Sequence, residues 1–248
     1  ANKYSLNFRA TYNLKGKMRA SWVNCPNPFK GILVMGQSGT GKTAYIVKEI
    51  IRQQIQKGFG MFIHDFKYPD LTNVAYYHFQ KNKHKYRNEP GFYVIDFENI
   101  QHRCNPLMPE SIHSITDAAS ASRAILLGLN QDWLDHQGDF WIESSINFVT
   151  ALIWYLRLYN NGIYCTLPHV IELAQTDFDK LFSILRAQPT LEALVSPFVK
   201  AYQEDAGKQL MGQISGAAVV LGTLSTEKLY YVLSGDDFTM SINDPQHP

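Results

Sequence analysis

Cysteine, charge and long apolar runs are all scarce in this sequence. Its 248 residues include three cysteines, Cys25, Cys104 and Cys165, which lie far apart and show no C-x-x-C spacing. These features exclude a disulfide scaffold and a zinc module, and they favour a reducing compartment. The longest strongly apolar stretch, residues 148–156, has about half the length of a membrane span. The sequence therefore excludes a span within these residues, and no signal peptide is recognisable.

Net charge is also small, at +1, but it is unevenly distributed. Residues 1–106 carry 16 Lys and Arg and 6 Asp and Glu, a net of +10, whereas residues 107–230 carry 7 and 13, a net of −6. The last 18 residues add three aspartates and no base. A change of sign near Pro106 predicts a domain boundary. We expect a nucleotide-binding part at 1–106, an all-α insertion at 107–229 and a return at 230–248.

Residues before Pro106 alternate between β and helical patterns. Residues 6–22 predict a β-hairpin, because apolar and polar residues alternate on both sides of a Lys15-Gly16 turn. Residues 43–57 have the apolar spacing of an amphipathic helix. Short apolar runs typical of strands buried on both faces lie at 32–35, 61–63 and 92–95. Strands that alternate with a helix indicate an α/β fold with a parallel core sheet.

The residue pattern after Pro106 is typical of helices. Expected helices lie at 116–129, 140–159, 168–175, 177–187 and 190–204. Residues 208–222 are small and Gly-rich, and residues 230–233 and 238–242 predict extended segments that return to the sheet. The predicted fold is therefore α/β, with a parallel core sheet, an N-terminal β-hairpin and an all-α insertion.

The strongest motif is an eight-residue segment that matches G-x-x-x-x-G-K-[ST] in full. It reads Gly36-Gln37-Ser38-Gly39-Thr40-Gly41-Lys42-Thr43, between a predicted buried strand and a predicted amphipathic helix. Glycines let backbone N–H groups point at phosphate oxygens, and a helix N-terminus adds its positive end. Lys42 is the expected catalytic cation on the β- and γ-phosphates, and the Thr43 hydroxyl the expected Mg²⁺ ligand. We favour this ATP and Mg²⁺ site over a glycine-rich turn that merely caps a helix.

Two aspartates follow predicted strands and face the crevice where α/β sheets bind ligands. Asp65, in Asp65-Phe66-Lys67, would lie near Mg²⁺ or water; alternatively it caps the turn that Pro69-Asp70 completes. Asp96 is a similar, weaker candidate. Neither is followed by a second carboxylate, so the sequence shows no convincing Walker B aspartate.

A basic run at 81–87 is a candidate contact for nucleic-acid phosphates. Its cations are Lys81, Lys83, Lys85 and Arg87, with Tyr86 available for stacking on a base. The alternative is a solvated loop, the usual state of a charge run. The histidines and cysteines lack the spacing of metal ligands or nucleophiles, so we expect structural or solvated roles.

Five segments occur in order across residues 27–150. They are Asn27-Pro28-Phe29-Lys30-Gly31, the motif at 36–43, Phe62-Ile63-His64-Asp65-Phe66-Lys67, His102-Arg103-Cys104-Asn105-Pro106-Leu107 and Phe140-Trp141-Ile142-Glu143-Ser144-Ser145-Ile146-Asn147. Together they resemble the TraG-like conjugative coupling proteins, the ATPases that feed DNA to type IV secretion systems. The third is similar to the family's aspartate-x-lysine segment, although Phe66 replaces the usual proline. The fourth and fifth are similar to its Asn-Pro-Leu turn and its Phe-Trp helix start.

The resemblance implies a RecA-like domain carrying an all-α domain. It implies a homo-oligomeric, hexameric ring that couples ATP hydrolysis to the passage of single-stranded DNA, with DNA-processing and type IV secretion proteins as partners. It also implies a parent anchored at the cytoplasmic face of the bacterial inner membrane, of which this chain is a soluble fragment. The family's Walker B strand would lie beyond Pro248. Hydrolysis is therefore expected of the parent rather than of this chain alone.

Two other functions fit parts of the sequence. The first is a nucleotide-binding adaptor, whose acidic helical domain docks DNA-processing or secretion proteins without turning over ATP, since an acidic surface repels DNA. The second is a small-molecule kinase, which needs an arginine-bearing lid. The insertion has only Arg123, Arg157 and Arg186, scattered in helical patterns, so we disfavour the kinase.

Overall fold

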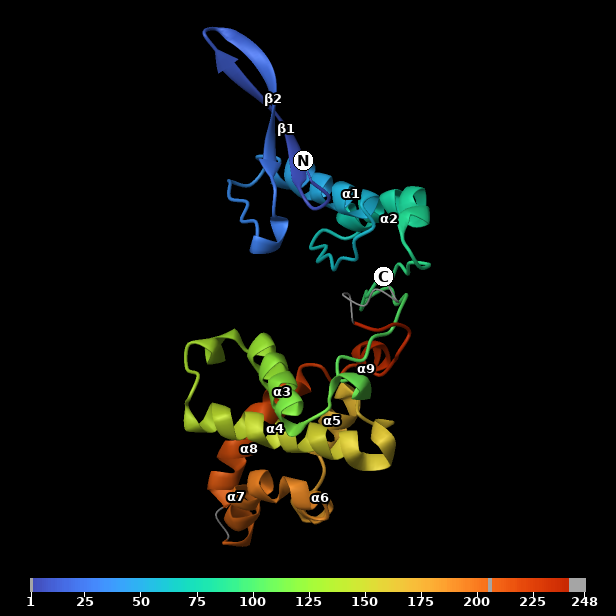
Figure 1. Cartoon of the computed structure of the whole chain (residues 1–248). Helices are drawn as coiled ribbons and strands as arrows, with labels where there is room; N and C mark the ends of the chain where they lie inside the picture. Colours follow the sequence, from blue (N-terminus) through green and yellow to red (C-terminus); the bar gives the residue numbers. More distant parts are fainter. Residues whose placement is uncertain (1, 205–206, 241–248) are drawn as a thin grey trace. The chain divides into compact units, whose positions relative to one another are not determined.

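The computed structural model describes residues 2–204 and 207–240, which fall into two compact units (Figure 1). The first unit ends at Phe92, and the second runs from Tyr93 to Met240. The structure is mixed α/β and mostly helical, as the fold class predicts at its coarsest level.

The predicted N-terminal hairpin is confirmed. Strands β1 (Leu6–Leu14) and β2 (Lys17–Cys25) pair antiparallel, from Leu6 opposite Cys25 to Leu14 opposite Lys17. Lys15 and Gly16 join them with φ angles of 50° and 80°. Two positive φ values give a tight turn whose twist matches that of the strands. The hairpin projects beyond the helices of its own unit (Figure 1).

Two helices form the small core of the first unit. A π-helical turn (Lys42–Val47) continues directly into α1 (Lys48–Gln56), which confirms the helix predicted at 43–57. Helix α2 (Asp70–Asn82) packs against α1 and buries Ile51, Ile55 and Ala75 between them.

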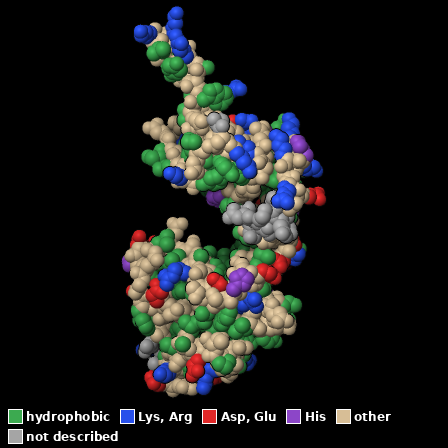
Figure 2. Space-filling view, viewed as in Figure 1, with side chains coloured by type: hydrophobic (Ala, Val, Ile, Leu, Met, Phe, Trp, Pro, Cys, Tyr) green, Lys and Arg blue, Asp and Glu red, His purple; other side chains and the backbone are tan. Residues whose placement is uncertain are grey.

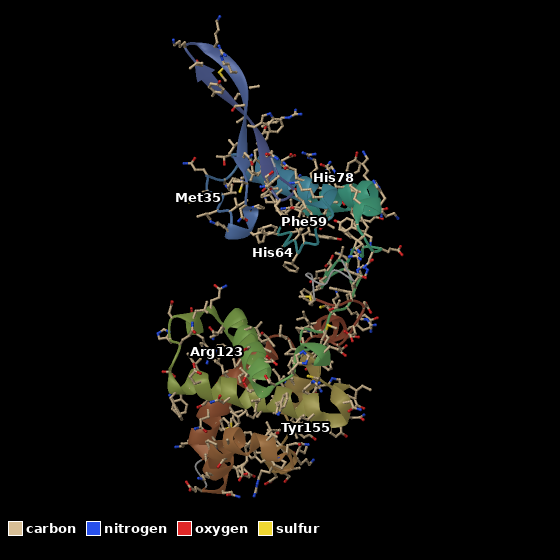
Figure 3. All side chains as sticks on the ribbon, in the orientation of Figure 1. Met35, Phe59, His64, His78, Arg123 and Tyr155 are labelled. Carbon is tan, nitrogen blue, oxygen red and sulfur yellow. The ribbon has the colours of Figure 1, made fainter. Side chains whose placement is uncertain are left out.

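The described residues do not form the predicted parallel core sheet. In that part of the chain the hairpin is the only strand ladder, and no strand forms in the apolar runs at 32–35, 61–63 and 92–95. Ile63 packs against the cluster between α1 and α2, whereas its neighbour Phe62 is 66% exposed. Met35, labelled in Figure 3, is 80% exposed. A parallel sheet needs cover on both faces, and this unit supplies one helical layer.

The second unit is built from helices α3 to α9. Their bounds are α3 (Ile115–Leu129), α4 (Phe140–Leu158), α5 (Leu167–Ala174), α6 (Phe178–Arg186), α7 (Glu192–Gln203), α8 (Gly207–Gly222) and α9 (Glu227–Leu233). The five helices predicted between residues 116 and 204 are thus confirmed to within a few residues. Polar caps begin several of them: Ser114 and Asp117 form a capping box on α3, and Asp139 caps α4.

Helix α4 is the centre of this unit, with α3, α5, α7 and α8 packed around it (Figure 1). Its middle turns are apolar on every side, and Phe148, Val149, Leu152 and Ile153 are all buried. An all-round apolar helix is stable in water only when other helices surround it. Within the described part of the chain, no helix has the length and apolar character needed to cross a membrane.

The small residues at 208–222 belong to α8 and let it approach α4 closely. A Cβ added at Gly212 would lie 2.9 Å from the Trp141 ring, and one at Gly216 would lie 3.0 Å from the Ser145 hydroxyl. The Ser145 hydroxyl also donates to the Gln213 carbonyl at 3.2 Å. Gly212 and Gly216 therefore allow α8 to pack closely against α4.

The extended return predicted at the C-terminal end is wrong where it can be seen. Residues 230–233 lie in α9, whose start is capped by the Thr226 hydroxyl accepting from the Leu229 N–H. A four-residue apolar run does not distinguish a strand from a buried helical turn. Here the Thr226 cap favours the helix. Residues 238–240 are irregular, and 241 and 242 of the second predicted segment lie outside the described residues.

Candidate functional site

In the loop at 36–43, residues 36–40 are irregular and exposed, and Lys42 and Thr43 begin the helical turn before α1. Gly39 and Gly41 have φ angles of 79° and 81°, which residues with a Cβ rarely adopt. A Cβ at Gly41 would also lie 2.6 Å from the Tyr45 ring. Two glycines of the motif are therefore required by the backbone itself.

The end of this loop offers unpaired hydrogen-bond donors. The Tyr45 N–H donates to the Gly41 carbonyl at 2.9 Å. Within the described residues, no hydrogen bond takes up the backbone N–H groups of Gly41, Lys42 or Thr43. Free N–H groups at the start of a helix attract anions. The Thr43 side chain is exposed, so its hydroxyl is accessible to a bound ligand.

The Lys42 side chain folds back over the loop. Its ammonium donates to the Gly36 carbonyl at 2.6 Å and to the Gln37 carbonyl at 2.8 Å. The Thr40 hydroxyl donates to the same Gln37 carbonyl at 2.8 Å. An ammonium has three donors, so one remains for a ligand oxygen. The loop thus carries both a cation and free N–H groups, the combination that binds phosphate.

Asp65 caps helix α2 in this structure. Its Oδ2 accepts from the N–H groups of Leu71 and Thr72 and from the Thr72 hydroxyl, each at 2.9 Å. Pro69, at the N-cap position, has no side-chain acceptor to offer, so Asp65 takes over that role. No hydrogen bond or ion pair joins Asp65 to the loop at 36–43 among the described residues. Its Oδ1 is buried without a hydrogen-bond partner there.

We expect Asp65→Asn to separate the capping and metal-binding hypotheses. Asparagine is a good helix cap, so this variant should keep its stability within about 0.5 kcal/mol, whereas Asp65→Ala should lose about 1 kcal/mol. If capping is its only role, both variants keep the wild-type Mg²⁺ dependence of nucleotide binding. Urea titration and nucleotide titration with and without Mg²⁺ measure the two properties. Loss of the Mg²⁺ dependence in Asp65→Asn would assign Asp65 to the metal.

The other metal and acid candidates have local partners. Asp96 Oδ1 accepts from the N–H groups of Glu98 and Asn99, bonds that lower the pKa of Asp96. The His169 ring lies 2.7 Å from the Thr166 hydroxyl. In residues 2–204 and 207–240, no group of three or more His, Cys, Asp or Glu side chains is arranged to hold a metal.

The basic run at 81–87 ends α2 and continues as a short 3-10 turn, with Lys81, Lys83, Lys85 and Arg87 all exposed. Lys81 contacts Tyr77, its ammonium 4.3 Å from the ring centroid. Tyr86 is less available for stacking than predicted, because it is half-buried and its hydroxyl donates to the Phe59 carbonyl at 3.1 Å. Burial raises the pKa of Tyr86.

Two of the segments behind the family resemblance, 102–107 and 140–147, lie in the second unit and make contacts that hold it together. The Asn105 amide donates to the Cys165 carbonyl at 2.9 Å, and its oxygen accepts from the Leu107 N–H. Glu143 pairs with Arg123, which projects from α3 (Figure 3). Sequence reasoning assigned no structural role to Asn105 or Glu143.

Arginines and cysteines in the second unit also have structural partners. The Arg157 Nε donates to the carbonyls of Pro109 and Ile112, both at 2.9 Å. With Arg123 paired to Glu143, two of the three arginines in the predicted insertion have structural partners. Burial raises the pKa of the Cys165 thiol to about 11, and Cys104 is also buried. A thiol with a high pKa is a poor nucleophile at neutral pH.

Comparisons with protein-family models, with curated proteins and with solved structures find no match to this chain. The resemblance to coupling proteins therefore rests on the five sequence segments. The loop at 36–43 carries the functional argument on its own residues.

Proposed function

We propose that this chain binds ATP and Mg²⁺ through the loop at 36–43 and belongs to a coupling ATPase that drives single-stranded DNA into a type IV secretion channel. The observation that carries the proposal is the complete G-x-x-x-x-G-K-[ST] motif, in which Lys42 lies across the loop and free N–H groups start a helix. Backbone N–H groups would hold phosphate, Lys42 would neutralise it, and Thr43 would bind Mg²⁺.

The proposal includes a RecA-like nucleotide-binding domain. Ile63 and Phe92 pack against the cluster between α1 and α2, and Phe62 and Tyr93 are exposed. This alternation is what a strand shows when one of its faces is covered. In a RecA-like domain, strands at 61–63 and 92–95 would pair with other strands and would be covered on both faces. A homo-hexamer at the cytoplasmic face of the inner membrane, with DNA-processing and secretion proteins as partners, follows from the resemblance.

Direct titration tests the nucleotide-binding half of the proposal. A fluorescent ATP analogue with Mg²⁺ should bind the chain, and unlabelled ATP should displace it. Inorganic phosphate should compete only weakly, because it lacks the contacts of the other phosphates. Failure of the analogue to bind would remove ATP from the proposal.

Neutralising the basic run tests whether it contacts DNA. We expect the combined Lys81→Gln, Lys83→Gln, Lys85→Gln and Arg87→Gln variant to bind oligo(dT) more weakly. If all four cations meet phosphates, the slope of log K against log salt should fall by about 3, since each contact on a single strand contributes about 0.7. Fluorescence anisotropy over a salt series measures this. An unchanged slope would assign the run to a solvated loop.

A second function is favoured by the charge of the helical unit. Residues 93–240 carry 8 Lys and Arg and 17 Asp and Glu, a net of −9, and they form a compact unit with its own core. An acidic surface of this kind suits a basic protein partner and repels DNA. Under this hypothesis the chain is an adaptor that binds nucleotide without turning it over. DNA-stimulated hydrolysis would exclude it.

A further inference from the structure

The β1–β2 hairpin concentrates positive charge away from the core of its unit. Arg9, Lys15, Lys17 and Arg19 lie on it and are all exposed. The first acidic residue of the whole sequence is Glu49, so residues 1–48 contain no negative side chain. Figure 2 shows Lys and Arg side chains gathered at the end of the hairpin. Its charge therefore suits a polyanion.

Exposed aromatic rings lie among these cations. Trp22 stands opposite Arg9, whose guanidinium lies 5.6 Å from the ring, and Tyr12 stands opposite Arg19. Trp22 is 59% exposed and Tyr12 45%. Large rings left in water on a two-stranded ribbon contribute nothing to a core. They are available to stack on unpaired bases, as aromatic side chains do in single-strand binding proteins.

Successive residues of a strand point to opposite faces, and this distributes the rings and cations over both faces. Arg9 and Trp22 lie on one face, and Tyr12, Lys17 and Arg19 lie on the other. A segment that docks on a membrane surface instead separates an apolar face from a charged one. Mixed charge and aromatic character on each face favours a nucleic-acid strand over a lipid surface.

The root of the hairpin is fixed to helix α1. The Gln53 side chain is buried and makes two hydrogen bonds to the backbone of Asn7: it accepts from the N–H at 3.0 Å and donates to the carbonyl at 2.7 Å. Lys57 also donates to the Ser5 carbonyl. The hairpin is thus held on the helix that follows the loop at 36–43.

We infer that the β1–β2 hairpin binds single-stranded nucleic acid, its cations on phosphates and Trp22 and Tyr12 on bases. The inference deepens the proposed function, since it names a segment that would hold the moving DNA strand. It assigns this contact to residues 9–22, separate from the basic run at 81–87.

The test uses the full chain and a labelled oligo(dT) of about 20 nucleotides, long enough to cover one binding site. Trp22→Ala should weaken binding about tenfold, as expected for the loss of one stacked base, whereas Trp22→Phe should stay within about threefold of wild type because a ring remains. Thr11→Ala, an exposed change on the Trp22 face, is the matched control and should have no effect.

Charge removal gives a second, independent measurement. The Arg9→Gln, Lys15→Gln, Lys17→Gln and Arg19→Gln variant should lose about 3 from the salt slope, through four phosphate contacts at about 0.7 each. A Lys3→Gln and Lys30→Gln variant removes two exposed cations of the same unit that lie outside both candidate segments, so it controls for net charge. Circular dichroism and thermal unfolding verify that each variant folds.

Three results would overturn the inference. The first is unchanged oligo(dT) affinity in both Trp22→Ala and the hairpin quadruple variant. The second is equal affinity for a duplex of the same length, because paired bases are not free to stack. The third is hairpin-dependent binding to phosphatidylserine vesicles without hairpin-dependent binding to oligo(dT). The ATP analogue is titrated in parallel. Because hairpin binding to oligo(dT) and ATP binding are measured separately, the failure of one can be told from the failure of the other.

Discussion

Lys42→Ala is expected to weaken binding of ATP with Mg²⁺ about 10- to 150-fold. The ammonium already lies across the loop, held by the carbonyls of Gly36 and Gln37, with one donor left. A hydrogen bond to a charged group contributes about 1.5–3 kcal/mol, which corresponds to this range. Where the protein turns over ATP, loss of a preorganised cation from the transition state should lower kcat about 10²- to 10³-fold. Nucleotide titration and phosphate release measure the two effects.

Two control variants make this result specific. Lys48→Ala removes a cation from the next turn, where Lys48 pairs with Asp70 at 2.6 Å, and it should leave nucleotide affinity nearly unchanged. Lys42→Arg keeps the charge, but a planar guanidinium does not reproduce the compact ammonium. It should therefore bind more weakly than wild type. Normal affinity in Lys42→Ala would show that the loop at 36–43 is a helix cap rather than a phosphate site.

The predicted elements that formed are those specified by local chemistry. The Lys15-Gly16 turn and the alternation on either side of it fix the hairpin register. Helices α3 and α4 begin at polar caps that are visible in the sequence, Ser114 and Asp139. Such signals act within a few residues, so one sequence is enough to find them.

The predictions that failed depended on distant partners. The run at 61–63 is apolar enough for a central strand, but a strand exists only where another pairs with it and layers cover its faces. The run at 230–233 shows the same limit, because Thr226 starts a helix there instead. Short apolar runs predict burial better than they predict backbone conformation.

The candidate site shows a similar division. The glycines and Lys42 were predictable because the motif specifies the residues that let backbone N–H groups and a cation contact phosphate. The sequence is compatible with two roles for Asp65, and the hydrogen bonds from Leu71 and Thr72 show that it caps α2. That outcome depends on where α2 begins, which is among the least certain features of any sequence-based prediction. The exposure of Trp22 on the hairpin could not be predicted either, because alternation alone does not show which face of a hairpin is covered.

The second large effect is expected on the stability of the helical unit. Phe148→Ala should destabilise it by about 3–5 kcal/mol, through lost burial and the cavity left behind. Phe148 is 1% exposed at the centre of α4, and its ring meets the Phe198 ring of α7 edge-on, with centroids 5.8 Å apart. A single domain has only about 5–15 kcal/mol to lose. The midpoint of thermal unfolding should fall by roughly 10 °C, at about 2–4 °C per kcal/mol.

Phe140→Ala is the matched control, because it makes the same chemical change on the same helix at a residue that is 57% exposed. It should cost less than about 1 kcal/mol, since little of the ring leaves a packed environment. The loop at 36–43 belongs to the other compact unit, so Phe148→Ala should still bind the ATP analogue at temperatures where its own unit has unfolded. Loss of ATP-analogue binding at the temperature where the helical unit unfolds would show that this unit is required for the nucleotide-binding loop to form. The adaptor hypothesis would then lose its independent docking domain, because nucleotide binding and the acidic surface would fold as one.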